Sequence, residues 1–381
     1  MVKCDPTEAD DDQKMSMNES EILADWFSKP GDSIRRLMHK RGVSVESLAS
    51  NFSDGVSDVR GLLDGSLAIE SESAATLAAT VGGTKKFWLK RQDKYEQALD
   101  RAVSCAVSFE FEDWLDKVPD PKPARKGKSD EATTREAIRR RLKYFNVPTI
   151  SSWQARYGHL LSETRFRKTD AYETVDSSIL LWLRQGELEA EMVVTQPWDA
   201  TKLEERLGSI TKLSQISKPS RFLPKLRALC AEAGVAVVVV KTPRGCPASG
   251  ATRRIASDKA MLLLSFRYLS DDQFWFTVFH EIGHLLLHGD NTYVDGEQTE
   301  EDECEREAND YAHKCIIPED RLDEFASLPG NRKAVLRFST SLGVSTGLVV
   351  GQMQYFKKIE PSKLNGLKRH WKWVEINSAF E

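Results

Sequence analysis

The 381-residue chain lacks the features of a secreted or membrane-spanning protein. Its six cysteines are scattered and form no C-x-x-C pair, a distribution typical of reduced, cytosolic thiols and not of a disulfide framework. The N-terminus is acidic and has no apolar stretch like that of a signal peptide. The most apolar run, VAVVVV at 235–240, fits a buried strand and is far shorter than the roughly 20 residues that span a bilayer. We therefore expect a cytoplasmic protein without a membrane partner.

The chain also has little excess of charge and few histidines. Its 54 basic and 58 acidic residues give a formal net charge of -4, which argues against a protein that coats nucleic acid non-specifically but leaves room for a local basic face. Its length and its 40% hydrophobic content allow one large core or two to three smaller ones. Because there are 7 histidines in all, two of them at a regular spacing carry more information than usual.

Changes in composition divide the chain into parts. VPDPKPARKGKSD at 118–130 is rich in Pro, Lys and Gly and has no apolar period, which is typical of a linker or long loop. The predicted order is a disordered acidic tail (1–19), a helical module (20–104), a linker (105–131), a helical region (132–222), a core with strands (223–320) and a C-terminal helical extension (321–381). The predicted fold class is α+β, with an all-α N-terminal module and a small β-sheet in the core.

The predicted core begins with a helix, LPKLRALCAEAG, that leads into the strand VAVVVV. Two more strands, ATRRIA at 251–256 and AMLLLSF at 260–266, precede a long apolar helix. We expect AMLLLSF to lie at the edge of the sheet, where an extended peptide can add as a further strand.

The apolar helix has clear start and stop signals. It begins near Asp271, where the helix dipole favours negative charge. Ser270 and Gln273 have the spacing of a capping box, in which each side chain satisfies a free backbone N–H. Gly289 is placed to end the helix.

This helix carries the sequence HEIGH. His280 and His284 are four residues apart and therefore lie on one face, where two imidazoles can bind a single metal ion. Glu281 is rotated by about 100° around the helix, so it can reach a water on the metal without ligating the metal. The pattern predicts a catalytic Zn²⁺ site with Glu281 as the general base. The plain alternative is a pair of buried core histidines beside a surface glutamate.

A zinc site of this kind needs a third protein ligand. In one common pattern a histidine six residues after His284 supplies it, but Asp290 stands there and Leu287 replaces the expected glycine. The other common solution is a glutamate on a following helix, and ECEREANDYAHKCIIP has the composition of such a helix.

On that second helix, Glu305 and Asn309 fall on one face. Ala308 and Ala312 belong to the same stripe and are small enough to let the helix lie close to the HEIGH helix. Asn309 is placed to accept a hydrogen bond from the free ring nitrogen of a ligating histidine. Glu305 is therefore the predicted third ligand, with Glu307 of the same acidic run as the alternative.

The sequence leaves open which group stabilises the oxyanion that forms during peptide hydrolysis. Tyr311, His288 and Tyr268 each carry a donor near the predicted site. His288 lies two turns after His280 on the same helix, and we expect it to be a structural neighbour of the site and not a ligand.

HEIGHLLLH followed by EREANDYAHKCIIP resembles the ImmA/IrrE family of zincin-like metallopeptidases, which are known for cleaving helix-turn-helix repressors. LPKLRALCAEAGVAVVVV, ATRRIA and MLLLSFR are similar to the segments that precede the catalytic helix in that family, and the resemblance extends over about 135–375. It implies a zincin-like core in which His280, His284 and Glu305 bind the metal. It also implies that Glu281 is the general base.

Near the predicted site, Asn309 keeps the pattern of this family, whereas Tyr311 stands where Phe is commoner. The resemblance leads us to expect a zinc endopeptidase whose substrate is a regulatory protein, either a repressor or an antitoxin. The alternative is a non-catalytic transcription regulator or antitoxin-like binding protein that uses the zincin fold as a sensor.

Residues 30–101 resemble the helix-turn-helix of HigA-type proteins. Ser44 is placed to cap the second helix. A turn at Asp54 and Gly55 precedes VSDVRGLLDG, which has the position of a recognition helix and ends at Gly65.

Ser44, Ser57 and Arg60 are the candidate DNA contacts of this module. The recognition helix and the turn before it carry three aspartates against Arg60 alone among basic residues, although attraction to phosphates normally supplies most of the affinity for DNA. The alternative is a helix-turn-helix kept for forming a homodimer or for docking a repressor or toxin partner.

Overall fold

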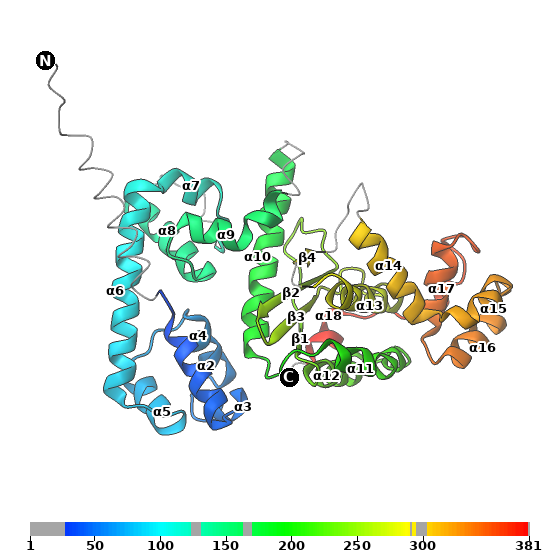
Figure 1. Ribbon diagram of the computed structural model, residues 1–381, viewed down its shortest axis with the longest axis horizontal. Helices are drawn as coiled ribbons and strands as arrows, with labels where there is room; N and C mark the ends of the chain where they lie inside the picture. Colours follow the sequence, from blue (N-terminus) through cyan, green and yellow to red (C-terminus); the bar gives the residue numbers. More distant parts are fainter. Residues whose placement is uncertain (1–26, 123–130, 163–169, 290–291, 295–302, 380–381) are drawn as a thin grey trace, which may run out of the picture. The chain divides into compact units, whose positions relative to one another are not determined.

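The computed structural model describes residues 27–122, 131–162, 170–289, 292–294 and 303–379. The chain divides into two compact units, residues 1–173 and 174–381 (Figure 1). The boundary between them lies inside the segment 132–222 that we expected to be one helical region. The predicted disordered tail, 1–19, lies outside the described residues.

The described residues of unit 1 form helices and no strands. The helices are α2 (Pro30–Arg41), α3 (Val45–Ala49), α4 (Val56–Asp64), α5 (Ser71–Thr80), α6 (Lys85–Phe109), α7 (Phe111–Asp116), α8 (Glu131–Phe145) and α9 (Ile150–Ser162). Because α6 continues to Phe109 and α7 follows directly, much of the segment 105–131 that we expected to be a linker is helical. Residues 123–130 of that segment lie outside the described part of the chain.

Local signals set the ends of the first helices as predicted. The Ser44 hydroxyl accepts a hydrogen bond from the backbone N–H of Ser47 at 3.1 Å and so caps α3. Gly55 precedes α4 and Gly65 ends it, with φ angles of 57° and 81° that favour glycine. A small core joins these helices, and its fully buried side chains include Ile34, Leu48, Val59, Leu77 and Trp88.

The long helix α6 extends beyond the predicted module because its apolar face continues. Leu99 and Ala106 are 0% and 1% exposed. Helix α8 is attached to α6 by ion pairs from Arg139 to Glu96 and Asp100. The helices on both sides of the expected linker therefore belong to one unit.

Unit 2 contains a four-stranded mixed sheet in the order β1-β3-β2-β4, with helices around it (Figure 1). Its elements are α10 (Asp170–Met192, which starts just before the unit boundary), α11 (Ala200–Leu213), α12 (Pro219–Ala231), β1 (Val235–Val239), β2 (Gly250–Ala256), β3 (Lys259–Leu264), α13 (Asp271–Leu287), β4 (Tyr293–Val294), α14 (Glu303–Ile316), the 3-10 helix η1 (Glu319–Arg321), α15 (Leu322–Ala326), α16 (Arg332–Leu342), α17 (Thr346–Tyr355), the 3-10 helix η2 (Asn365–Leu367) and α18 (Trp373–Asn377).

The three predicted strands are present as β1, β2 and β3, but their order differs from the prediction. Strand β3 pairs with β1 in parallel and with β2 in antiparallel orientation, so it lies inside the sheet. The expectation that AMLLLSF forms an edge is therefore wrong. An uninterrupted apolar run is typical of a strand inside a sheet that is covered on both faces, and β3 is such a strand. The short strand β4, which pairs with β2 at Ala251 and Thr252, was not predicted.

Helices cover both faces of β3. Leu262 and Leu264 belong to the same buried core as residues of α12 and α13. Leu263 points to the opposite face, where a Cβ on Gly186 of α10 would lie 2.5 Å from its Cδ2 atom. Trp182 of α10 also donates a hydrogen bond from Nε1 to the Val240 carbonyl at 2.8 Å. The sheet thus lies between α10 and the helix that carries HEIGH.

The start of α13 differs from the prediction. Ser270 occupies the N-cap position, but its side chain makes no capping hydrogen bond, so the predicted capping box is wrong. Instead, the C-terminal segment runs past this end of the helix. The backbone N–H of Arg369 donates to Asp271 Oδ1 at 2.9 Å, and Lys368 Nζ lies 2.6 Å from Asp272 Oδ2. The backbone N–H of Asp271 also donates to the Arg369 carbonyl at 3.0 Å, so a tertiary contact replaces the local cap.

Gly289, with a φ of 70°, follows the end of α13 as predicted. The described cysteines, Cys105, Cys230, Cys246, Cys304 and Cys315, are free thiols. Within the described residues, no one helix has the length and apolar character needed to cross a membrane, although α16 and α17 taken together as a bent pair meet that test of length and composition.

Candidate metal centre

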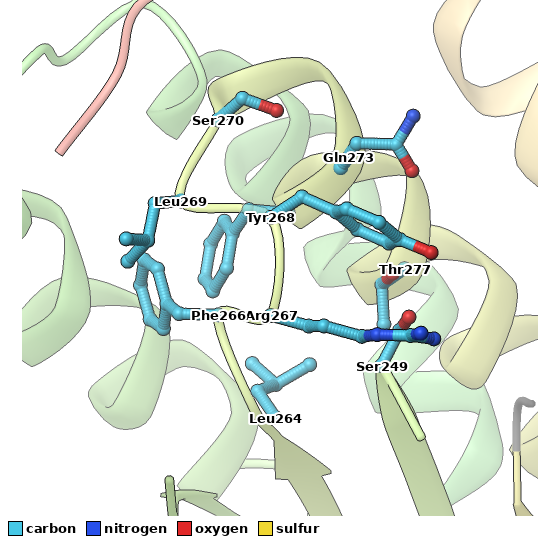
Figure 2. Close-up of a pocket in the computed structure, with 10 residues that line it drawn as sticks. Ser249, Leu264, Phe266, Arg267, Tyr268, Leu269, Ser270, Gln273 and Thr277 are labelled. Atoms are coloured by element: carbon cyan, nitrogen blue, oxygen red, sulfur yellow. The ribbon is translucent and has the colours of Figure 1, made fainter. Parts of the chain in front are cut away.

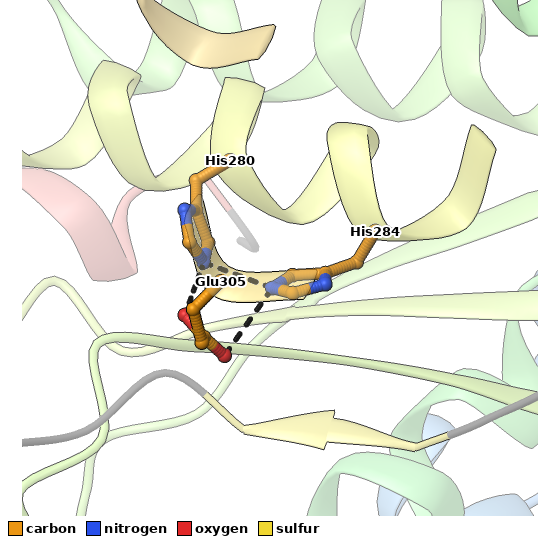
Figure 3. Close-up of side chains that lie close together, drawn as sticks. All are labelled: His280, His284 and Glu305. Atoms are coloured by element: carbon orange, nitrogen blue, oxygen red, sulfur yellow. Dashed lines mark hydrogen bonds and ion pairs between the residues drawn. The ribbon is translucent and has the colours of Figure 1, made fainter. Parts of the chain in front are cut away.

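Two helices bring the predicted metal ligands together (Figure 3). His280 and His284 lie one turn apart on α13 and are 3% and 1% exposed. Helix α14 approaches α13 closely, because a Cβ on Gly283 would lie 3.2 Å from Tyr311 Cβ and 3.3 Å from Ala308 Cα. Ala308 was expected to permit this approach. Gly283, inside HEIGH, is a second requirement that the sequence pattern had not indicated.

The donor atoms of three side chains converge at this helix pair. His280 Nε2 and His284 Nε2 are 3.0 Å apart, and the two carboxylate oxygens of Glu305 lie 3.3 Å and 3.5 Å from them. The three ligand atoms all lie within 4.8 Å of one another. Two imidazole nitrogens and one carboxylate oxygen are a donor set that zinc prefers. The residues therefore fit a single divalent cation.

The surroundings of the cluster favour the protonation states that metal ligands need. Burial lowers the pKa of His284, which keeps its imidazole neutral. Burial alone would raise the pKa of Glu305, but the adjacent His280 and His284 outweigh it and lower that pKa to about 2. A neutral imidazole and an ionised carboxylate are the forms that bind metal.

Of the two candidate glutamates on α14, Glu305 is the one that reaches the histidines. Its side chain is 11% exposed, whereas that of Glu307 is 53% exposed. Glu307 Oε2 instead lies 2.9 Å from His288 Nε2, and His288 Nδ1 lies 2.9 Å from His284 Nδ1. The geometry favours Glu305 as the ligand. Glu307 contacts His288, which in turn contacts His284, so Glu307 does not reach the donor atoms.

Each of the two imidazoles is held by further neighbours. Asn309 Oδ1 lies 3.0 Å from His280 Nδ1, which is the contact that the sequence predicts. Tyr293 of β4 stacks on the ring of His284, with centroids 4.2 Å apart and an interplanar angle of 11°. Contacts at Nδ1 and on the ring face hold imidazoles in the orientation that leaves Nε2 facing the other donor atoms. Tyr293 was not predicted, because it reaches His284 through the short strand β4.

Glu281 is fully buried and lies beside the start of β2. A Cβ on Gly250 would lie 2.5 Å from Glu281 Oε1 and 2.6 Å from Thr277 Cγ2. No side chain fits at that position without displacing Glu281. Gly250 is therefore a further residue that shapes the site, and the sequence signal for β2, which began at the next residue, did not include it.

The three candidates for oxyanion stabilisation lie in different surroundings. His288 is engaged with a ligand imidazole. Burial raises the pKa of Tyr311, and the nearby Cys315 and Glu204 raise it further. Tyr268 lies in the loop before α13, where it is 49% exposed.

The candidate DNA contacts lie on α3 and α4 of unit 1. The Ser44 hydroxyl is used as a helix cap, and Ser57 and Arg60 are exposed on α4. Exposure of this kind is compatible with a DNA partner and with a protein partner alike.

Comparison with known proteins gives one family match. Residues 236–351 match the Peptidase M78 model, described as the IrrE N-terminal-like domain. This segment runs from β1 to α17 and contains the predicted site residues His280, Glu281, His284 and Glu305. It covers less than a third of the chain, so the ImmA/IrrE resemblance is supported here and not over all of 135–375. No curated protein matches the chain.

The matched segment also extends past residue 320, where we expected the core to end. The structure gives the reason, because Leu348 and Val349 of α17 are buried in the same apolar core as α13. The match suggests a metallopeptidase, and the three-residue cluster is one that could hold a metal ion.

Proposed function

We propose that this protein is a zinc-dependent endopeptidase. The observation that carries the proposal is the convergence of His280, His284 and Glu305 from two helices, with Glu281 buried on the same helix but outside the donor set. The match of residues 236–351 to a peptidase family supports the same chemistry.

The side chains divide the chemistry between them. His280, His284 and Glu305 would hold the zinc ion, which when bound would supply Lewis-acid chemistry. Glu281 takes a proton from the attacking water and returns it to the leaving amine. Asn309 orients His280, and the stacked ring of Tyr293 orients His284.

For the substrate we propose a regulatory protein, either a helix-turn-helix repressor or an antitoxin, in a stress, phage or toxin-antitoxin setting. Support comes from the resemblance of HEIGHLLLH and EREANDYAHKCIIP to the ImmA/IrrE family. Helices α2 to α6 add to it, because a helix-turn-helix in the same chain would bring the peptidase to DNA or to a protein bound there.

The rival function is a non-catalytic regulator that uses the same cluster as a metal sensor. A sensor needs the three ligands but has no use for a base beside them. Burying a carboxylate costs free energy, yet the Glu281 carboxylate is buried. The glycine at position 250 leaves the space that this carboxylate occupies. Glu281 therefore favours the enzyme.

The test compares the full-length wild type with Glu281→Gln and His280→Ala, each co-expressed with candidate repressors and antitoxins. We expect wild type alone to cleave one of them. Loss of the general base should reduce the cleavage rate by about 10²- to 10⁴-fold and leave the bound zinc unchanged. His280→Ala should lose both zinc and activity. Cleavage by Glu281→Gln at the wild-type rate would contradict the mechanism.

A second measurement tests the helical module. Glu281→Gln protein is mixed with DNA at two salt concentrations and followed by gel shift. A shift that weakens as salt increases supports contact with phosphates. No shift at low salt supports a module that docks on protein.

A further inference from the structure

A hollow lies between the loop that precedes α13 and the first turns of that helix (Figure 2). It is open to solvent, and its volume of about 250 Å³ includes part of that opening, so it is too small for a cofactor or a drug-sized ligand. Ser249 and Thr277 form the side nearest the centre of α13, and Arg267 and Tyr268 extend toward them from the loop.

The hollow adjoins the predicted general base. Thr277, which lines it, lies one turn before Glu281 on α13. The Thr277 methyl and the Glu281 carboxylate lie close together on either side of Gly250. A Cβ on Gly250 would lie 2.6 Å from Thr277 Cγ2 and 2.5 Å from Glu281 Oε1. Ser249, the residue before Gly250, also lines the hollow. A side chain seated there would therefore belong to a residue next to the reacting bond.

The loop is held in a conformation that large side chains rarely adopt. Phe266 and Leu269 both have a φ of 53°, which costs free energy in residues other than glycine. Core contacts offset that cost: the Phe266 ring stacks on Phe274 at 4.1 Å, and the Leu269 carbonyl accepts a hydrogen bond from the Trp371 backbone N–H at 2.8 Å. With its two flanking residues anchored, the loop presents Arg267 and Tyr268 outward.

The lining has one charge and an apolar floor. Arg267 is the single charged residue among the ten that line the hollow. Its guanidinium lies 5.1 Å from the Tyr268 ring centroid and donates a hydrogen bond to the Pro247 carbonyl, so its position is fixed. Leu264 and Phe266, 1% and 4% exposed, form the floor. An occupant with an apolar stem and an anionic end matches both features.

We propose that this hollow is a specificity subsite that binds a glutamate side chain of the substrate next to the bond that is cleaved, with Arg267 as the residue that selects it. This inference rests on the proposed peptidase function. The acids closest to the loop do not oppose it, because Asp271 and Asp272 are engaged with the C-terminal segment through Arg369 and Lys368. Glu281, beyond Thr277, is balanced by the cation that the cluster is proposed to hold.

The test measures binding and not turnover. Two short peptide hydroxamates, identical except for Glu or Gln next to the metal-binding group, are titrated into the zinc-loaded full-length protein by calorimetry. We expect the Glu compound to bind about tenfold more tightly, as for one well-placed partly exposed ion pair. In Arg267→Gln the two affinities should become equal, and Arg267→Glu should prefer a Lys compound. Arg332→Gln, which removes an exposed arginine at the start of α16, should behave as wild type.

The Gln compound also reports on folding, because its affinity should stay the same in wild type and Arg267→Gln. The proposal is overturned if wild type binds the two compounds equally, if Arg267→Gln keeps the preference for Glu, or if the zinc-loaded protein binds neither compound. A failure of the peptidase function looks different: no protein is cleaved by wild type, while the Glu preference is still measurable.

Discussion

The predicted recognition helix α4 and the HEIGH helix α13 hold their polar side chains differently. On α13, His280 and His284 are almost fully buried and face a third buried ligand. On α4, Ser57 and Arg60 are exposed to solvent. Burial of polar groups costs free energy unless they are paired or bind a ligand. A buried, convergent cluster thus points to a specific chemistry, whereas exposed polar residues leave the partner undefined.

The sharpest way to break this comparison is to remove one buried ligand. Glu305→Ala should weaken zinc binding by more than about a hundredfold, which exceeds the loss typical of changes in the residues around metal ligands. Glu307→Ala is the matched control on the same helix, because Glu307 contacts His288 and not the donor atoms. Competition with a fluorescent zinc chelator measures both affinities. Equal losses in the two variants would refute the assignment of Glu305.

The next largest effect is expected from a substitution that displaces the proposed general base, Glu281, and leaves the metal ligands intact. In Gly250→Ala the new methyl group would lie 2.5 Å from Glu281 Oε1 and must displace that side chain. We expect peptidase activity to fall about a hundredfold, because a shift of about 1 Å in a reacting group has that effect. Zinc affinity should stay within about threefold. Gly208→Ala on α11, where a methyl meets nothing within 4 Å, is the control. Unchanged activity in Gly250→Ala would show that Glu281 does not need its observed position.

A smaller loss is expected where a neighbour of a ligand is removed. Asn309→Ala deletes the oxygen that lies 3.0 Å from His280 Nδ1 and should weaken zinc binding about tenfold. Asp310→Ala, on the exposed side of the same helix, should have no effect. The same chelator competition applies. An Asn309→Ala protein with wild-type affinity would mean that the contact does not orient the ligand.

The smallest effects are expected for substitutions at α3 and α4, which should change the free energy of unfolding and not the peptidase activity. Ser44→Ala removes a helix cap and should lower the free energy of unfolding by about 1 kcal/mol. Ser57→Ala changes an exposed residue and should stay within about 0.5 kcal/mol. Thermal unfolding of both variants provides the measurement. If Ser57→Ala were the more damaging of the two, Ser57 would have an undetected structural role.

Most of the cluster could be predicted from the sequence because its geometry is local. The four-residue spacing of His280 and His284 places both on one face of a helix. The pattern around Glu305 and Asn309 places these two residues on one face of the next helix. Two short elements with the right periodicity were enough. What remained was how closely the helices approach, and Gly283 contributes to that in a way the pattern did not show.

The missed features depend on contacts between segments far apart in the chain. Tyr293 reaches His284 through a strand of two residues that has no sequence signal of its own. The predicted cap at Ser270 is replaced by a contact with the C-terminal segment, about a hundred residues later in the chain. The position of AMLLLSF inside the sheet, in contrast, could have been predicted from the sequence. Its unbroken apolar run is typical of a strand covered on both faces.

The most direct test of the metal centre is a crystal structure of the zinc-loaded protein with anomalous diffraction recorded on both sides of the zinc absorption edge. We predict one anomalous peak about 2.0–2.2 Å from His280 Nε2, His284 Nε2 and a carboxylate oxygen of Glu305. Zinc bound at other side chains, with this cluster left without an anomalous peak, would contradict the proposed enzyme.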